Sequence, residues 1–147
     1  LDIIINRAYE IFGIEREVVS TMLDWNQVDE LKKQGITIGT HGMNHYILTN
    51  IDLSQRKHEI IDSLSILKEK TNSVSSYFCY PNGNYDDATI EIVKEAGFKG
   101  AIGTGIGFNT SATNKYCLNR IAIHEDISSS VGLLWFRIFQ GYLHTKH

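Results

Sequence analysis

The sequence predicts an α/β fold with a mostly parallel sheet, and two observations support this prediction. Segments with the 3.6-residue periodicity of amphipathic helices alternate along the chain with short apolar segments that are typical of strands. The chain has 147 residues, 42% of them hydrophobic and 21% charged, which is the size and composition of one globular domain with its own core. Such alternation implies helical crossovers between parallel strands, with functional groups at the carboxyl ends of those strands.

Each predicted helix has an apolar stripe and a residue that favours a helix end. Asp24 forms a capping box with Gln27, three residues later. The longest helix is expected to bury a stripe made of Ile60, Ile61, Leu64 and Leu67. The last helix has an apolar side made of Val131, Leu134, Trp135, Ile138, Phe139 and Tyr142. The helices are expected at residues 2–12, 24–35, from 52 or 54 to 67, from 86 or 87 to 97, and from 128–130 to 142.

The predicted strands are short, and each runs into a polar or glycine-containing segment. They are expected at residues 36–40, 77–80, 98–102 and 118–123. The loop at 81–84 consists of residues that break regular structure. The glycine-rich turn at 103–107 matches neither of the common phosphate-binding motifs, so we do not expect it to cradle a phosphate.

Composition and charge exclude several classes of protein. Fourteen Lys and Arg against seventeen Asp and Glu give a net charge of −3, which argues against a nucleic-acid partner because such proteins carry a basic face. No apolar run approaches the ~18 residues that a membrane span requires. Cys79 and Cys117 form no CxxC pair and are interpreted as free or buried thiols, with a single disulfide as the alternative.

Two histidines follow the predicted strand at 36–40. His41 and His45 are four residues apart, and Gly42 makes a strand-end loop more plausible than a helix. Imidazole is the commonest nitrogen ligand of zinc and similar ions, and two imidazoles from one loop would fill two coordination positions. The pair is interpreted either as two metal ligands or as two structural histidines held by hydrogen bonds.

Two further segments carry candidate functional groups. In residues 78–86 an aromatic strand runs into a Pro-x-Gly turn, which either presents main-chain N–H groups to an oxyanion or simply connects a strand to a capped helix. Arg120 lies within the apolar strand at 118–123 and is expected to need a carboxylate partner, because an unpaired buried charge is costly. His124 ends that strand, either as a functional group or as a surface histidine.

Three separated segments together resemble the polysaccharide deacetylases, the NodB-homology domains of carbohydrate esterase family 4. They are LDWNQVDELKKQGITIGTHGMNHYILTNID, FCYPNGNYDDATIEIVKEAGFKGAIGT and LNRIAIHED. The resemblance implies a distorted (β/α) barrel and a metal-dependent hydrolase that removes acetyl groups from N-acetylated sugars of a polysaccharide. It also implies that His41 and His45 bind a divalent metal, with zinc the first expectation. The substrate groove and its main-chain donor are then expected at Tyr80, Pro81, Asn82 and Gly83.

The sequence departs from the family pattern in three places. The TFDDG motif, which supplies the general base and a third metal ligand, is absent, and Asp86-Asp87 belong to another strand. Cys79 stands where the family often has an arginine, and Arg120 is expected to supply that charge from a different strand. His124 lies near the position of the family's catalytic acid but with the wrong spacing.

These departures imply that residues 1–147 are the C-terminal portion of a single deacetylase domain, folded as an incomplete barrel. The chain begins at Leu1 without a signal-peptide pattern, which agrees with this expectation, although the family resemblance implies an extracytoplasmic or cell-envelope location. The parent domain is expected to act on amide bonds and this chain to bind metal weakly. An incomplete barrel exposes a sheet edge, which favours pairing with a second copy. The alternatives are a non-catalytic remnant or carbohydrate-binding module of the same fold, and a plain α/β domain with two structural histidines.

Overall fold

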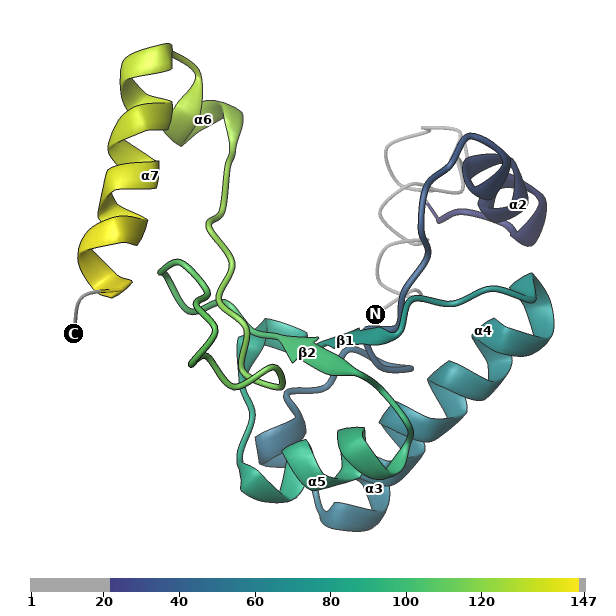
Figure 1. The fold of residues 1–147 in the computed structure, drawn as a ribbon. Coiled ribbons are helices and arrows are strands. Elements are labelled where there is room, and N and C mark those ends of the chain that lie inside the picture. The colour runs from purple at the N-terminus through teal and green to yellow at the C-terminus, as the bar shows by residue number, and fades with distance from the viewer. Residues whose placement is uncertain (1–21, 146–147) are drawn as a thin grey trace, which may run out of the picture.

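The computed structural model describes residues 22–145 and has a two-stranded parallel sheet at its centre (Figure 1). Strand β1 (Tyr77–Cys79) pairs with β2 (Gly100–Ile102), and Phe78 lies opposite Ala101. Single parallel bridges extend the sheet on both sides, from Thr40 to Phe78 and from Ile102 to Leu118. Four parallel segments therefore lie side by side, and the mostly parallel α/β architecture is confirmed as part of a barrel.

The predicted outer strands are shorter in the structure than expected. Residues 36–40 and 118–123 each contribute one bridge instead of a ladder. Each of these segments has a neighbouring strand on one side only within residues 22–145, so half of its backbone groups lack a strand partner there. The helix predicted at residues 2–12 lies outside the described residues.

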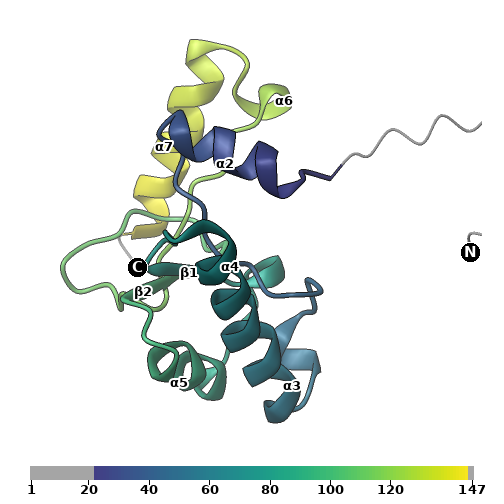
Figure 2. The ribbon, with the colours of Figure 1, turned by 90° about the vertical axis from the view of Figure 1, so that its right-hand side faces the viewer.

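Helices α3, α4 and α5 cover one face of the sheet, whereas α2, α6 and α7 lie beyond the other face (Figure 2). The capping box at the start of α2 (Trp25–Lys33) is present, with the Asp24 side chain accepting the Gln27 N–H at 2.8 Å. Helix α5 (Asp87–Glu95) is capped by Asp86. Both helix starts therefore agree with the predictions from capping residues.

One helical run of three parts replaces the long helix predicted from residue 52 or 54. It consists of α3 (Leu53–Lys57), the π turn η2 (His58–Asp62) and α4 (Ser63–Thr71). The π turn contains more residues per turn than an α-helix and therefore rotates the faces before and after it. Ile60 is buried as expected, but Ile61 is exposed and Glu59 is buried in its place. The expected buried stripe is thus only partly correct.

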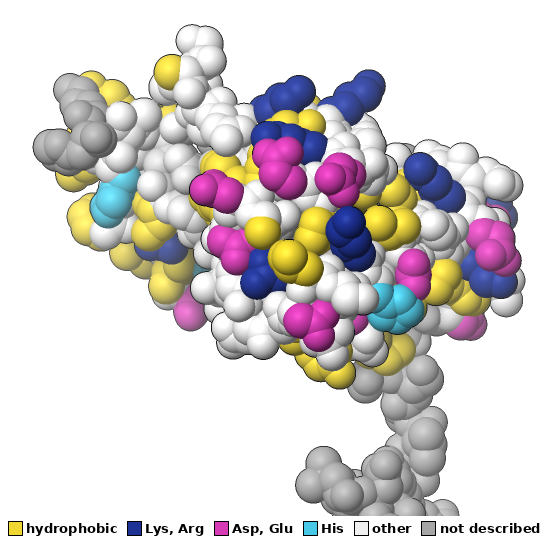
Figure 3. Space-filling model, turned by 90° about the horizontal axis from the view of Figure 1, so that it is seen from below, with side chains coloured by type: hydrophobic (Ala, Val, Ile, Leu, Met, Phe, Trp, Pro, Cys, Tyr) yellow, Lys and Arg dark blue, Asp and Glu magenta, His cyan; other side chains and the backbone are white. Residues whose placement is uncertain are grey.

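The hydrophobic core lies between the sheet and α3–α5. Its fully buried members include Phe78 and Ala101 from the strands, with Ile60, Val93 and Leu48 from the helical layer. Leu48 belongs to a short 3-10 turn, η1 (Leu48–Asn50). On the outer face of this layer, acidic and basic side chains are intermingled rather than gathered in one basic patch (Figure 3).

The C-terminal helices differ from the prediction in burial. The short α6 (Glu125–Ser128) was not predicted, and α7 (Val131–Thr145) begins where a helix was expected. The expected apolar side of α7 is largely exposed, with Trp135 64% and Phe139 53% accessible to solvent. Periodicity identifies an apolar side but cannot show whether another element covers it. No helix within residues 22–145 is long and apolar enough to cross a membrane.

A buried arginine joins α3 to α5. Arg56 donates from Nη1 to both carboxylate oxygens of Asp86 at 2.7 Å and to Thr89 Oγ1 at 2.9 Å. Its Nε donates to Ile51 O at 3.0 Å, and Nη2 donates to Thr49 O at 3.4 Å. Hydrogen bonds from the Thr89 hydroxyl and N–H, together with the Arg56 guanidinium, outweigh the opposing effect of burial and lower the pKa of Asp86 to about 2.

We expect the stabilising contribution of Asp86 to disappear in acid. Its pKa in the folded state, about 2, lies below the ordinary value of 3.8. The contribution is therefore complete above about pH 4 and is lost as the pH falls through about 2. Urea unfolding of the wild type and Asp86→Asn should give free energies that differ at pH 5 and converge towards pH 2. A difference that does not change with pH would contradict this assignment.

Candidate functional site

The carboxyl ends of the parallel segments place the candidate residues at one edge of the sheet. His41 follows the Thr40 bridge, and the turn at Pro81 follows β1. Arg120 lies two residues after the Leu118 bridge. The convergence follows from parallel pairing, because such strands end on the same side. The structure therefore brings together three of the segments that the sequence singled out.

The two histidines of the first segment lie against each other. Their ring centroids are 4.8 Å apart, in an edge-on arrangement. The Nδ1 atom of His41 lies 2.8 Å from Cys79 O. A carbonyl oxygen can only accept, so Nδ1 carries a proton in this contact, and in the neutral imidazole Nε2 is then the nitrogen with the free lone pair. A carbonyl contact of this kind orients metal-binding histidines, so the geometry of His41 fits a ligand.

The loop that carries these histidines is anchored by Glu59, a residue that sequence reasoning missed. Glu59 Oε2 accepts the N–H groups of Met43 at 2.8 Å and Asn44 at 2.9 Å, and Oε1 accepts Asn44 Nδ2 at 2.6 Å. Burial would raise the pKa of Glu59, but the hydrogen bonds from Asn44 and Met43 hold it below the ordinary value. The available signal was an acidic residue next to Ile60, inside an otherwise apolar stripe.

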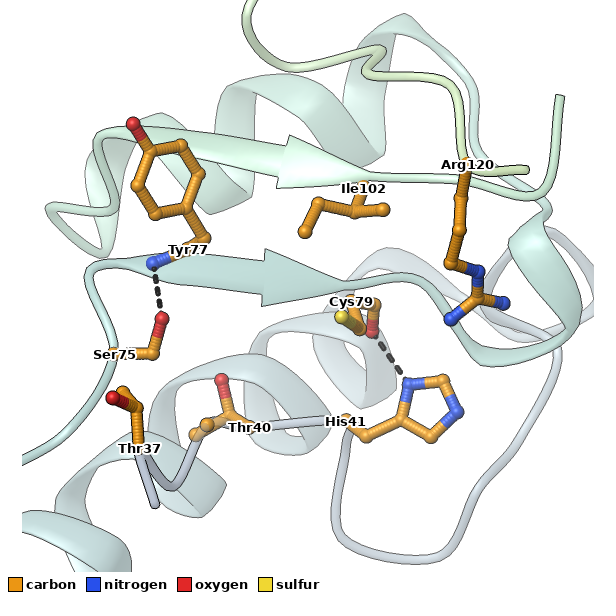
Figure 4. A pocket seen from close by; sticks show the side chains of 9 residues that line it. Thr37, Thr40, His41, Ser75, Tyr77, Cys79, Ile102 and Arg120 are labelled. Carbon is orange, nitrogen blue, oxygen red and sulfur yellow. Dashed lines mark hydrogen bonds between the residues drawn. The ribbon is translucent and has the colours of Figure 1, made fainter. Parts of the chain in front are cut away.

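A pocket of about 390 Å³ opens beside His41 (Figure 4). The Arg120 side chain points towards the His41 ring, and Cys79, whose carbonyl oxygen contacts that ring, lies beside both. Thr40 Oγ1 is buried and has no hydrogen-bond partner within residues 22–145. The pocket is lined by Thr37, Gly39, Thr40, His41, Ser75, Tyr77, Cys79, Ile102 and Arg120. The structure thus places Arg120 and Cys79 at the same pocket as the first histidine.

The expectation that Arg120 needs a buried carboxylate is wrong for the described part of the chain. Arg120 is exposed and forms no ion pair within residues 22–145. Its backbone N–H donates to Gly105 O at 2.9 Å instead of to a strand partner. Because the guanidinium remains in solvent at the pocket mouth, no desolvation cost requires a partner.

Fewer residues of the turn at Tyr80–Gly83 are accessible to a substrate than the family resemblance implied. The side chains of Tyr80 and Pro81 are in the core and do not line a groove. The Tyr80 hydroxyl donates to Tyr116 O at 3.0 Å, and burial raises the pKa of this phenol. Asn82 is exposed and Gly83 is half-buried, so these two residues form the accessible part of the turn.

One main-chain donor of this turn remains available. Tyr80 N–H donates to Ile102 O at 3.0 Å and Gly83 N–H donates to Tyr80 O at 2.9 Å, while proline has no N–H. The Asn82 N–H alone among these residues forms no hydrogen bond with the described part of the chain. Asn82 has a φ of 55°, a left-handed conformation that breaks the helical pattern of the turn. Within this turn, Asn82 therefore has the N–H group that remains free to donate to a ligand.

His124 is not brought to this site. It precedes α6, where its carbonyl accepts the N–H groups of Ile127 at 3.2 Å and Ser128 at 2.9 Å. Its side chain is exposed and lines neither the pocket beside Arg120 nor a second pocket of about 370 Å³ that lies against Met43. Residues 22–145 also contain no group of three His, Cys, Asp or Glu side chains that could hold a metal ion.

Comparison with known proteins defines the class of fold. The structure of a Streptococcus pyogenes deacetylase, PplD, in complex with acetate matches with a TM-score of 0.72 and 26% identity over 84% of this chain and 52% of that chain. A Bacillus anthracis protein described as a polysaccharide deacetylase matches with a TM-score of 0.70 and 22% identity, over 82% of this chain and 38% of its own. The fold is therefore that of the NodB-type deacetylases.

The sequence comparisons identify the family. The sequence model of the polysaccharide deacetylase family matches residues 8–101, and the chain belongs to this family. YxkH of Bacillus subtilis strain 168, which is assigned by name to the polysaccharide deacetylases, is 24% identical over 104 residues, or 71% of this chain. The chain spans 37% of the length of YxkH and 52% of that of PplD.

Proposed function

We propose that this chain is part of a metal-dependent deacetylase that removes acetyl groups from N-acetylated sugars of a polysaccharide. The observation that carries the proposal is the histidine pair at the carboxyl end of a parallel strand, with His41 oriented by Cys79 O at 2.8 Å. Family membership and the acetate bound to PplD support deacetylation as the reaction class. Because the chain covers only part of its relatives, the activity belongs to the whole domain.

The residues present fit two ligands of a divalent metal site. His41 and His45 would hold the ion, with zinc the first expectation. When bound, such an ion polarises the amide carbonyl and lowers the pKa of a bound water. We assign the third ligand and the general base to a segment outside residues 22–145, because the described part contains no third donor beside the histidines.

The other residues of the site bind and orient the substrate. Asn82 N–H would donate to the carbonyl oxygen as negative charge develops on it, which is the task of an oxyanion hole. Arg120 would place a positive charge at the pocket mouth, where it orients the polar sugar or an acidic partner. His124 is not assigned as the general acid, because it starts α6 outside the pocket.

A second candidate function is favoured by the incomplete donor set. A carbohydrate-binding remnant with the same groove would keep Asn82 and Arg120 without needing a third metal ligand. Such a chain would bind an N-acetylated oligosaccharide with an affinity independent of added metal. Titration of the chain with such an oligosaccharide, with and without cobalt(II), separates the two functions.

Cobalt(II) titration of the purified chain, followed by calorimetry and visible absorption, tests the metal proposal. We expect weak binding by the wild type and at least a tenfold loss in His41→Ala and in His45→Ala, because each variant removes one of two ligands. His58→Ala is the matched control, since His58 is exposed and paired with Asp62 on the helical layer. Binding that is unchanged in both ligand variants would overturn the assignment.

The isolated chain is expected to show no deacetylation of a chitooligosaccharide. The physical reason is that the sequence lacks the TFDDG motif, to which the family resemblance assigns the base and the third ligand, and residues 22–145 hold no third donor beside the histidines. Acetate release measured with and without added zinc checks this expectation. Metal-dependent and His41-dependent release by the chain alone would show that the missing groups lie within it.

A further inference from the structure

We propose that Glu59 is the positioning residue of the histidine loop: its carboxylate holds residues 41–45 in the conformation that brings the two imidazoles together. The proposal rests on the proposed function, because it treats His41 and His45 as metal ligands. Glu59 touches neither imidazole through a hydrogen bond. It acts through the backbone of Met43 and Asn44, between the two histidines.

The loop has a backbone conformation that needs an external support. Gly42 has a φ of 85° and His45 a φ of 58°, both in the left-handed region. For a residue with a Cβ, such as His45, this conformation is strained and persists only where the surroundings impose it. The three hydrogen bonds to Glu59 lie between these two residues and are the contacts that impose it.

Gly42 is also fitted to the carboxylate by its lack of a side chain. A Cβ placed on Gly42 would lie 3.0 Å from Glu59 Oε2, closer than ordinary contact. The loop backbone therefore approaches the carboxylate at a distance that only glycine allows without movement. Gly42, which lies between the two histidines, is therefore needed for the loop to pack closely against the Glu59 carboxylate.

The π turn explains how an acidic residue reaches this place. Glu59 is the second residue of η2 and is 1% exposed, on the same side as Ile60. A π turn is rare and is frequently found at functional sites, where it turns a side chain to a face that an α-helix would not give it. Here the π turn directs the Glu59 carboxylate into the protein interior, towards the histidine loop.

Charge makes the carboxylate difficult to replace. Within residues 22–145 no Lys or Arg forms an ion pair with Glu59, so its charge is compensated by the three N–H donors of the loop. A glutamine would have the same shape, but it would be neutral, so its single oxygen would accept the Met43 and Asn44 N–H groups more weakly than a carboxylate does. Its NH2 group would face Asn44 Nδ2 unless the Asn44 amide turned over. Glu59→Gln therefore weakens the loop's support with little change in volume.

The test compares Glu59→Gln and Asn44→Ala with the control Thr71→Val, all in the full chain. Asn44 is exposed, and its variant loses only the side-chain donor to Glu59, so it will fold. Thr71 is buried at the other end of α4, where its hydroxyl donates to Leu67 O and Ser73 O and supports a different loop. We expect cobalt(II) affinity to fall 10- to 100-fold in Glu59→Gln and several-fold in Asn44→Ala, and to stay unchanged in Thr71→Val.

A second readout needs no metal. In the metal-free chain, NMR should show slow hydrogen exchange at the Met43 and Asn44 amides, and this protection should be reduced in Glu59→Gln but kept in Thr71→Val. Unchanged protection of both amides in Glu59→Gln, or equal losses of cobalt affinity in all three variants, would overturn the proposal. If the wild type binds no cobalt, the proposed function fails while the exchange rates still decide the role of Glu59. If Glu59→Gln does not fold, an unchanged cobalt(II) affinity in Asn44→Ala counts against the proposal.

Discussion

Gly83→Ala is expected to lower the free energy of unfolding by about 3 kcal/mol and to displace the turn that carries Asn82. Gly83 has a φ of 78°, where a Cβ is strained. The added Cβ would also lie 2.7 Å from Thr104 Cγ2 and 2.8 Å from Thr104 Cβ. Rotation of the Thr104 side chain cannot relieve the contact with its own Cβ, so the backbone of one of the two loops must move.

A matched glycine separates the two causes of this effect. Gly97 has a φ of 88°, and a Cβ there would meet no atom within 4 Å. Gly97→Ala should therefore lose only about 1 kcal/mol, from backbone strain alone. Urea unfolding of both variants, with Gly83→Ala repeated in a Thr104→Gly background, measures the contact. Equal losses at the two glycines would show that the contact with Thr104 has no effect.

Asp86→Ala is expected to lower the free energy of unfolding by about 3 kcal/mol, of which the lost helix cap accounts for about 1 kcal/mol. The remainder comes from Arg56, whose side chain is 10% exposed and would be left buried without its carboxylate. The loss is smaller than for a fully buried pair because Asp86 is 44% exposed and Arg56 keeps its bonds to Thr89 and two backbone carbonyls.

Asp24→Ala is the control for the cap, since Asp24 caps α2 in the same way but contacts no buried cation. It should lose about 1 kcal/mol at pH 7. The double variant Arg56→Met with Asp86→Ala should recover part of the loss, because it removes the unpaired charge. Chemical unfolding at pH 7 supplies all of these values, and equal losses at Asp24 and Asp86 would argue against a role for Arg56.

The parts of this structure that depend on local interactions were predictable from the sequence. Asp24 caps a helix as expected, and Asp52 and Asp86 are the caps at the two helix starts for which the sequence left two candidates each, because a cap needs only a side chain and the next turn. The meeting of His41 with the turn after β1 was also predictable, because parallel strands end on one side. These predictions required no knowledge of distant residues.

The other features depend on neighbours that the sequence does not reveal. Arg120 has no partner within residues 22–145 because it remains in solvent, and His124 is displaced because a short helix begins where a strand was expected to end. The Tyr80 side chain faces the core, where its hydroxyl donates a hydrogen bond to the backbone oxygen of Tyr116, 36 residues away. In each case the periodicity of the segment does not show which side chains the folded chain buries or where the next element begins.

The π turn at His58–Asp62 has a consequence for how relatives should be aligned. A π turn holds one residue more than the α-helical turn that would join the same two ends. A relative with an uninterrupted α-helix here would therefore be one residue shorter between Asp52 and Thr71. An alignment without a gap would pair Glu59 with a residue that faces solvent, and a single-residue gap restores the correspondence of buried positions.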